Sequence, residues 1–381
     1  MSTEVYQRLA HFLDNLPGGF PATESGIELQ ILEKLFLPEE AELLMHLSLL
    51  PEPANVIAYR SKLSTDQVAE MLARMEKKGL LYAQHKQGQA PQYMAMHFVV
   101  GIYEFQLNKM DPEIAELFEQ YLPYIVEPET WRKAPQIRTV PVGESIQAQA
   151  AVMDYERAEK LILAQERISV ADCICRQEKG ILGEPCVKPL ETCLSFGSGA
   201  DFYVRNEMGR YVTQEQALEI LHMAEETGLV LQPDAAQDAT FICCCCGCCC
   251  GVLTNLKRHP APANFAVTPF IAIHDEELCD GCGLCQERCQ MDALYLDDGI
   301  MHVDREYCIG CGLCITTCPN EALSLERKEG FEGDYLPKTS MDKFINLGKT
   351  RGVLDNRKMA KMFIQSKKDR LMAEKDPGSR D

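Results

Sequence analysis

Two copies of one cysteine spacing constrain what this chain can fold into more than any other feature. Each copy has the pattern Cys-x2-Cys-x2-Cys-x3-Cys, and the second begins 29 positions after the first. The eight cysteines are Cys279, Cys282, Cys285 and Cys289, then Cys308, Cys311, Cys314 and Cys318. This spacing directs three thiolates to one iron–sulfur cube and the fourth to a neighbouring cube. It therefore predicts two [4Fe-4S] clusters rather than zinc, because a zinc site needs four cysteines and not a fourth one lent across the repeat.

The repeat extends beyond the cysteines. Residues 278–294 align without gaps to residues 307–323. Glycines separate the cysteines in both copies, because a chain that curls around a cube must bring its N–H groups close to sulfur. These glycines are Gly281, Gly283, Gly310 and Gly312. Short alternating segments predict small strands flanking each cysteine loop. They cover residues 270–274, 294–296, 300–303 and 323–325.

These motifs resemble the bacterial two-cluster ferredoxins. The resemblance implies a ferredoxin domain over residues 266–328 and crossed ligation. In that arrangement Cys279, Cys282, Cys285 and Cys318 hold one cluster, and Cys308, Cys311, Cys314 and Cys289 hold the other. Pro319 follows the family pattern, whereas Gln290 stands where the family has proline. The departure affects the path of the first turn but not the ligands.

Residues 166–260 hold eleven more cysteines. Thiolates that are pressed together repel, and metal coordination relieves that repulsion. Neighbouring residues point in different directions, so a run of adjacent cysteines cannot all serve one cube. Val170 and Ile242 each lead into cysteines, which indicates strand ends that deliver ligands to a shared site. The expected metal ligands are Cys173, Cys175, Cys186, Cys193, Cys243, Cys245, Cys246, Cys248, Cys249 and Cys250.

We therefore expect at least one further [4Fe-4S] cluster in this segment, with ligands divided between the first four cysteines and the run. Three alternatives stay open: two further clusters, one cluster with several inert buried thiols, and zinc or a thiol–disulfide pair. Residues 173–251 resemble a segment of cluster-binding proteins of anaerobic bacteria. That resemblance implies a multi-domain architecture with a ferredoxin unit and an N-terminal helical domain.

Signals for catalysis are few. The Cys245-Cys246-Gly247 triplet is similar to those of heterodisulfide reductase catalytic subunits, but the long paired spacing of that family is missing. Phosphate-binding glycine loops, dinucleotide-binding glycine motifs and His-Glu-x2-His are absent from the sequence. Arg176 lies beside the cysteines, where it can offset cluster charge, bind a substrate anion or pair with Glu178 or Glu184. An electron carrier or electron-transfer subunit is favoured over a stand-alone enzyme.

The N-terminal third, residues 1–130, contains no cysteine and has helical periodicity. Ser64 and Gln67 form a capping box that predicts a helix over residues 66–78, ended by Gly79. Two predicted strands follow, and helices followed by a hairpin give the order of a winged helix. Residues 1–120 carry 17 Asp/Glu against nine Lys/Arg, which disfavours nucleic acid. We expect this domain to pack or to bind protein.

Charge and hydropathy complete the outline. The formal net charge is −19, and residues 266–327 carry 12 Asp/Glu against three Arg. That balance favours a redox partner with a basic docking patch. There is no apolar run long enough to span a membrane and no basic-then-apolar start, so we expect a reduced, cytoplasmic protein without a membrane span.

The sequence thus predicts a multi-domain α+β chain. Its expected parts are residues 1–130 (winged-helix-like), 131–165 (connector), 166–260 (Cys-rich cluster domain), 266–328 (ferredoxin domain) and 329–381 (charged tail, either a marginal helix or disordered). The expected function is electron transfer with an oxidoreductase partner. A redox-sensing iron–sulfur transcriptional regulator and an oxidoreductase with an active-site cluster in the middle domain are the alternatives.

Overall fold

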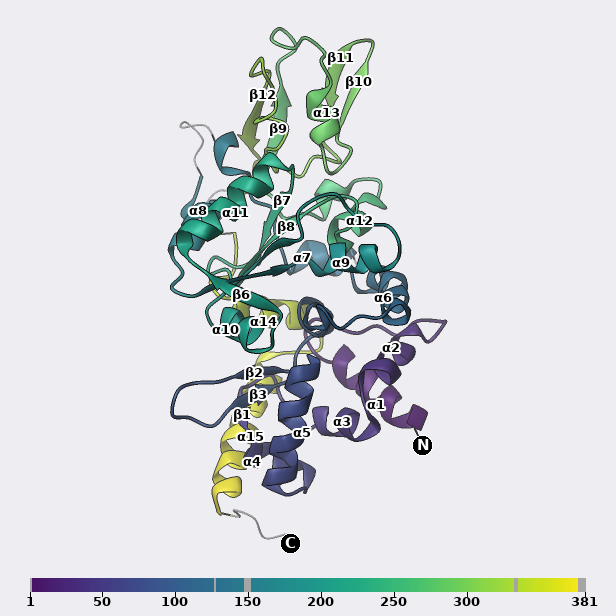
Figure 1. The fold of residues 1–381 in the computed structure, drawn as a ribbon, viewed down its shortest axis with the longest axis vertical. Helices are drawn as coiled ribbons and strands as arrows, with labels where there is room; N and C mark the ends of the chain where they lie inside the picture. Colours follow the sequence, from purple (N-terminus) through teal and green to yellow (C-terminus); the bar gives the residue numbers. More distant parts are fainter. Residues whose placement is uncertain (1, 127, 147–151, 332–334, 376–381) are drawn as a thin grey trace. The chain divides into compact units, whose positions relative to one another are not determined.

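A computed structural model describes residues 2–126, 128–146, 152–331 and 335–375 of the chain (Figure 1). Parts of the expected connector and charged tail lie outside the described residues. The chain forms two compact units, residues 1–125 with 344–381 and residues 126–343. Its mixed helix and strand content agrees with the predicted α+β class.

The N-terminal unit is mainly helical. In chain order it contains α1 (Ser2–Asp14), α2 (Ile27–Leu35), α3 (Pro38–Leu44), β1 (Glu52–Pro53), α4 (Ala54–Ser61), α5 (Thr65–Lys78), β2 (Tyr82–Gln84), β3 (Gln92–Met94), the short turns η1 (Phe98–Ile102) and η2 (Glu104–Gln106), α6 (Pro112–Ile125), and α15 (Asn356–Lys375). The strands form an antiparallel sheet in the order β1-β3-β2. Helix α14 (Ser340–Thr350) begins in the second unit and ends in this one.

Local signals fix the ends of α5. The Ser64 side chain accepts a hydrogen bond from the Gln67 N–H, and the Gln67 side chain reaches back to Ser64, so the predicted capping box is confirmed. Gly79 ends the helix in the left-handed conformation, at φ 77°. A Cβ there would lie 2.4 Å from the Phe105 carbonyl oxygen, so both the backbone angle and the packing require glycine.

Helix α15 packs against α4 within the N-terminal unit. The Arg60 guanidinium on α4 donates to Asp369 on α15 at 2.7 Å and to Glu52 at 2.6 Å. The Ser366 hydroxyl also donates to Glu52, whose side chain is fully buried. The pKa of Glu52 is lowered because these hydrogen bonds and Arg60 outweigh the opposing effect of burial.

The second unit combines the cysteine-rich middle segment and the cysteine repeat of residues 278–323. Its elements are α7 (Pro128–Lys133), η3 (Gly143–Ser145), η4 (Asp154–Glu156), α8 (Ala158–Leu163), β4 (Ile168–Asp172), α9 (Ile174–Ile181), β5 (Glu191–Phe196), α10 (Ser198–Arg205), β6 (Gly209–Val212), α11 (Gln214–Glu226), β7 (Val230–Pro233), β8 (Phe241–Cys245), α12 (Gly251–Lys257), η5 (Pro262–Asn264), β9 (Phe270–His274), α13 (Leu284–Arg288), β10 (Leu294–Asp297), β11 (Ile300–Val303) and β12 (Leu323–Arg327).

A five-stranded antiparallel sheet in the order β6-β4-β5-β8-β7 forms the centre of this unit. Val170 on β4 and Ile242 on β8 are fully buried, and both strands lead into cysteines as predicted. The repeat adds two small antiparallel pairs, β9 with β12 and β10 with β11. These strands and α13 lie together at one end of the unit (Figure 1).

One hydrophobic core joins the sheet to the repeat. Val170 and Ile242 belong to the same buried cluster as two residues of the repeat, Leu294 at the start of β10 and Leu313 between Cys311 and Cys314. Removing this shared apolar surface from water fixes the repeat against the sheet, so the two segments are not a pair of freely tethered domains. In the described part of the chain, we find no helix with the length and hydropathy needed to cross a membrane.

Candidate functional site

The strand pairing of the repeat explains how cysteines from its two halves meet. Cys318 shortly precedes β12, and β12 pairs with β9, which leads into Cys279. In the same way Cys289 shortly precedes β10, which pairs with β11 ahead of Cys308. Each half therefore delivers its last cysteine to the loop of the other half.

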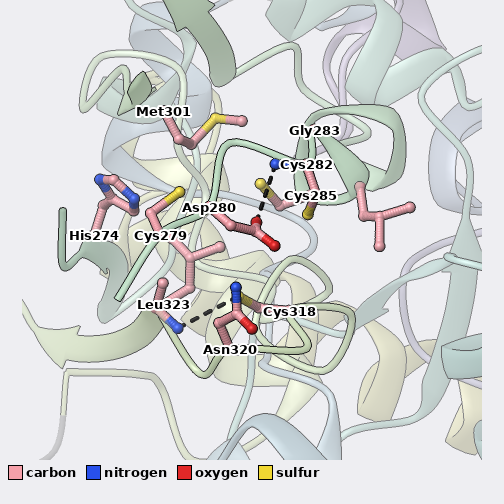
Figure 2. A pocket seen from close by; sticks show the side chains of 12 residues that line it. His274, Cys279, Asp280, Cys282, Gly283, Cys285, Met301, Cys318, Asn320 and Leu323 are labelled. Carbon is pink, nitrogen blue, oxygen red and sulfur yellow. Dashed lines mark hydrogen bonds between the residues drawn. The ribbon is translucent and has the colours of Figure 1, made fainter. Parts of the chain in front are cut away.

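The result is two hollows, each lined by four cysteines. The first is lined by Cys279, Cys282, Cys285 and Cys318 (Figure 2). The second is lined by Cys289, Cys308, Cys311 and Cys314. These are the two sets that the ferredoxin resemblance implied, each placed around one space.

Backbone donors in both hollows are arranged for thiolates. The N–H groups of Ala293 and Ala322, equivalent positions of the repeat, donate to Cys289 and Cys318 at 3.3 Å. Ala272 donates to Cys308 at 3.4 Å. Such bonds to sulfur stabilise thiolates and influence cluster potentials.

Burial makes bare thiolates unfavourable in the second hollow. It raises the pKa of Cys289 and Cys314, and it raises the pKa of Cys311 to about 12. A bound cation can reverse this effect, because a coordinated thiol loses its proton. The donor set and its surroundings therefore fit an iron–sulfur cluster.

Glycine also fits the tight path of these loops. The four glycines between the cysteines all have positive φ, from 61° to 79°. At Gly312 a Cβ would lie 2.1 Å from the Ser145 hydroxyl oxygen, so the connector packs directly on the second loop. The Val142 N–H donates to the Cys311 carbonyl oxygen at 3.0 Å in the same region.

In the middle segment, six cysteines form one continuous chain of thiol contacts, which we call the six-thiol group. Strands β5 and β8 place Cys193 directly opposite Cys243. Hydrogen bonds then connect neighbouring members of the group along the chain. In order the group is Cys193, Cys243, Cys245, Cys250, Cys175 and Cys173. It joins three cysteines of the first part of the segment to three of the run.

The hydrogen bonds of the six-thiol group shift the pKa values of its members in opposite directions. The thiols of Cys175 and Cys245 donate to the Cys250 sulfur and lower its pKa to about 5. The donating thiols have raised pKa values in turn, Cys245 through its hydrogen bonds and burial. One thiolate shared among several buried thiols is the arrangement that metal binding would neutralise.

Four other cysteines form a second, tighter cluster, which we call the four-thiol group. Its members are Cys186, Cys246, Cys248 and Cys249, whose sulfurs all lie within 4.8 Å of one another. The Cys186 sulfur is 3.6 Å from that of Cys248 and 4.0 Å from that of Cys246. Cys248 is exposed, so this group reaches the surface, whereas Cys246 is buried.

Arg176 is buried beside both thiol groups. Its guanidinium donates to the Cys244 carbonyl oxygen at 3.2 Å and to the Cys246 sulfur at 3.7 Å, and it also contacts Thr192. Burial raises the pKa of Cys246, but Arg176 outweighs this and brings it down to about 7. Of the two carboxylates suggested by the sequence as partners of Arg176, Glu184 instead pairs with Lys179 at 3.0 Å.

A contact that the sequence did not predict joins the run to the repeat. The Gly247 N–H donates to the side-chain oxygen of Gln290 at 2.8 Å. A Cβ at Gly247 would lie 2.0 Å from the Gln290 carbonyl oxygen, so only glycine allows this approach. Gln290 directly follows Cys289. In the sequence, the only indication of this contact is that glutamine stands where the ferredoxin family has proline.

Comparison with known proteins supports the repeat alone. A family model described as the 4Fe-4S dicluster domain matches residues 278–322. Searches of the curated proteins and of the solved structures gave no match. The chain thus carries a ferredoxin-type iron–sulfur domain within a larger cysteine-rich unit.

The assignment of each cysteine to one of the two hollows can be tested with two double variants. We expect Cys285→Ala with Cys318→Ala to lose about four irons and four sulfides, since both residues line the first hollow. The matched pair Cys285→Ala with Cys289→Ala should lose about eight irons, because these residues line different hollows. Iron and sulfide analysis after anaerobic reconstitution measures both. The reverse order of losses would show that each half ligates its own cluster.

Proposed function

We propose that this protein transfers electrons through a series of iron–sulfur clusters. The two hollows of the repeat each hold one [4Fe-4S] cluster, and the six-thiol group holds a third. Each bound cluster would accept and release electrons one at a time. The thiol-rich composition without disulfides suits a reduced, cytoplasmic setting.

The contact between Gly247 and Gln290 is the observation that carries this proposal. Cys245 of the six-thiol group lies two residues before Gly247, and Gln290 adjoins Cys289 of the second hollow. A route through covalent bonds and a single 2.8 Å hydrogen bond therefore links the middle site to the repeat. No gap has to be crossed through solvent.

Further contacts hold this route at a fixed length. The Arg288 guanidinium donates to the carbonyl oxygens of Glu225 and Glu226, at the C-terminus of α11. A cation at that end of a helix is also favoured by the helix dipole. Lys257 and Asp292 add an ion pair at 3.1 Å. These contacts lie on both sides of Gln290 in the sequence and support a constant separation of the two sites.

The proposed partner is a redox protein with a basic patch. All acidic side chains of residues 266–327 except Asp304 are exposed. Opposite charge on a partner would raise the association rate and orient docking, and the effect would weaken with salt. A partner that docks at the repeat would deliver its electron first to the cluster in one of the two hollows.

A transcriptional regulator is the main alternative, because α3, β1, α4, α5, β2 and β3 follow the order of a winged helix. The charges of α5 weigh against it. Arg74 and Lys78 both pair with the buried carboxylate of Glu40, which leaves fewer cations to meet phosphate. We propose that this winged-helix-like part packs or binds protein.

The third cluster predicts the iron content. Anaerobically reconstituted protein should hold clearly more than about eight irons per chain, the load of two [4Fe-4S] clusters. Cys245→Ala should lower that excess, because Cys245 bonds to two other members of the six-thiol group. Cys244→Ala is the matched control, since this neighbouring buried thiol belongs to neither group. A wild-type load that stays at eight, unchanged by Cys245→Ala, would refute the third cluster.

The route predicts a kinetic effect at Gln290. Gln290→Leu removes the acceptor for the Gly247 N–H, so it should slow reduction of the middle site several-fold while iron and sulfide stay at wild-type levels. Gln290→Glu keeps an acceptor oxygen and should be faster than the leucine variant. Rapid-freeze electron paramagnetic resonance would follow each cluster after mixing with a reductant protein. Equal rates in all three proteins would place the route elsewhere.

The charges of α5 predict no sequence-specific DNA binding at physiological salt. Any residual binding should fall steeply as salt rises, because it would rest on phosphate neutralisation alone. Selection from a random duplex pool, with full-length protein in its cluster-loaded and cluster-free states, tests this directly. Recovery of a defined palindrome would support the regulator instead.

A further inference from the structure

The four-thiol group has a geometry different from that of the two hollows. The Cys248 sulfur lies 3.6 Å from those of Cys186 and Cys249, and the Cys186 sulfur lies 4.0 Å from that of Cys246. Among the residues that the structure describes, the four-thiol group is the one set of three or more potential ligands whose donor atoms all lie within 4.8 Å of one another. The cysteine sets of the hollows are more widely spaced by this measure.

These separations match the coordination of one ion. With zinc–sulfur bonds of about 2.3 Å, the sulfurs of a regular tetrahedron lie about 3.8 Å apart. Around a [4Fe-4S] cube each thiolate bonds to a different iron, so the cube itself stands between the sulfurs and holds them further apart. The second unit therefore contains one set of closely spaced sulfurs, the four-thiol group, and two sets of more widely spaced sulfurs, those of the hollows.

We propose that Cys186, Cys246, Cys248 and Cys249 bind a single thiophilic divalent ion, Zn²⁺ or Fe²⁺, in a tetrahedral site separate from the iron–sulfur clusters. A tetrahedral set of four sulfurs suits these ions. Binding one ion with four thiolates releases the thiol protons and leaves two net negative charges at the site.

The surroundings of the four-thiol group compensate that charge. The Arg176 guanidinium donates to the Cys246 sulfur, and the Cys249 N–H donates to the same sulfur. Both donors are part of the fold around the site, and the single positive charge of Arg176 offsets part of the negative charge of the thiolates.

The position of the ion gives it a structural role. Cys186 comes from the loop between α9 and β5, whereas the other three ligands surround Gly247 in the sequence. One ion would therefore fasten this loop to the turn that holds Gly247 against Gln290. The ion would maintain the route to the repeat whether or not it carries electrons itself.

Metal analysis of the full-length, cluster-loaded protein tests this inference. Cys186→Ser and, independently, the exposed-site variant Cys248→Ser should each lose about one zinc or one iron per chain, with acid-labile sulfide unchanged. Cys244→Ala is the control and should retain the ion. Zinc and iron are distinguished by elemental analysis.

Two outcomes would overturn the inference. Loss of about four irons together with four sulfides in both serine variants would place a [4Fe-4S] cluster at this site. Unchanged metal content in both variants would show that the four-thiol group binds no ion. Neither outcome depends on the third cluster, whose failure would appear as about eight acid-labile sulfides in the wild-type protein and as no loss of iron or sulfide in Cys245→Ala.

Discussion

The alternation of side chains along β8 determines which cysteines of the run can share a site. Successive residues of a strand point to opposite faces, so Cys243 and Cys245 share a face that Cys244 does not. The strand ends at Cys245, and the chain then turns at Gly247. Cys246, Cys248 and Cys249 gather on Cys186, whereas Cys250 returns to Cys175 and Cys245. Seven nearly contiguous thiols are thereby divided between two sites and one buried position.

Much of the repeat could be predicted because its signals are local. The strands at residues 270–274 and 300–303 have the predicted bounds, and the glycines adopt the left-handed angles that the tight loops require. The division of the middle cysteines could not be predicted. It depends on β5 pairing with β8, which sets Cys193 opposite Cys243, 50 positions further along the chain. Nothing near either cysteine in the sequence specifies that register, because it is set by the core on which both strands pack.

Gln290 shows how a departure from a family pattern can carry structural meaning. Proline at this position would have neither an N–H nor a side-chain acceptor. Glutamine supplies the oxygen that the Gly247 N–H needs, at the point where the run closely approaches the repeat. The sequence revealed the departure but not its partner, which lies 43 positions away. Departures from a local sequence pattern are expected at positions where a contact with a distant part of the chain requires a different residue.

Arg176 determines how the middle site can tolerate added charge. Burial would lower the pKa of this guanidinium, yet the neighbouring Cys173 and Cys246 sulfurs raise it, so Arg176 stays protonated. A lysine would offer one compact charge, whereas the planar fork of arginine donates to the Cys244 carbonyl oxygen and the Cys246 sulfur together. The positive charge is therefore fixed in place between the two thiol groups and does not titrate. If the proposed cluster in the middle segment received an electron, it would meet a cation already oriented toward sulfur, and the added charge would be stabilised without a large rearrangement of the fold.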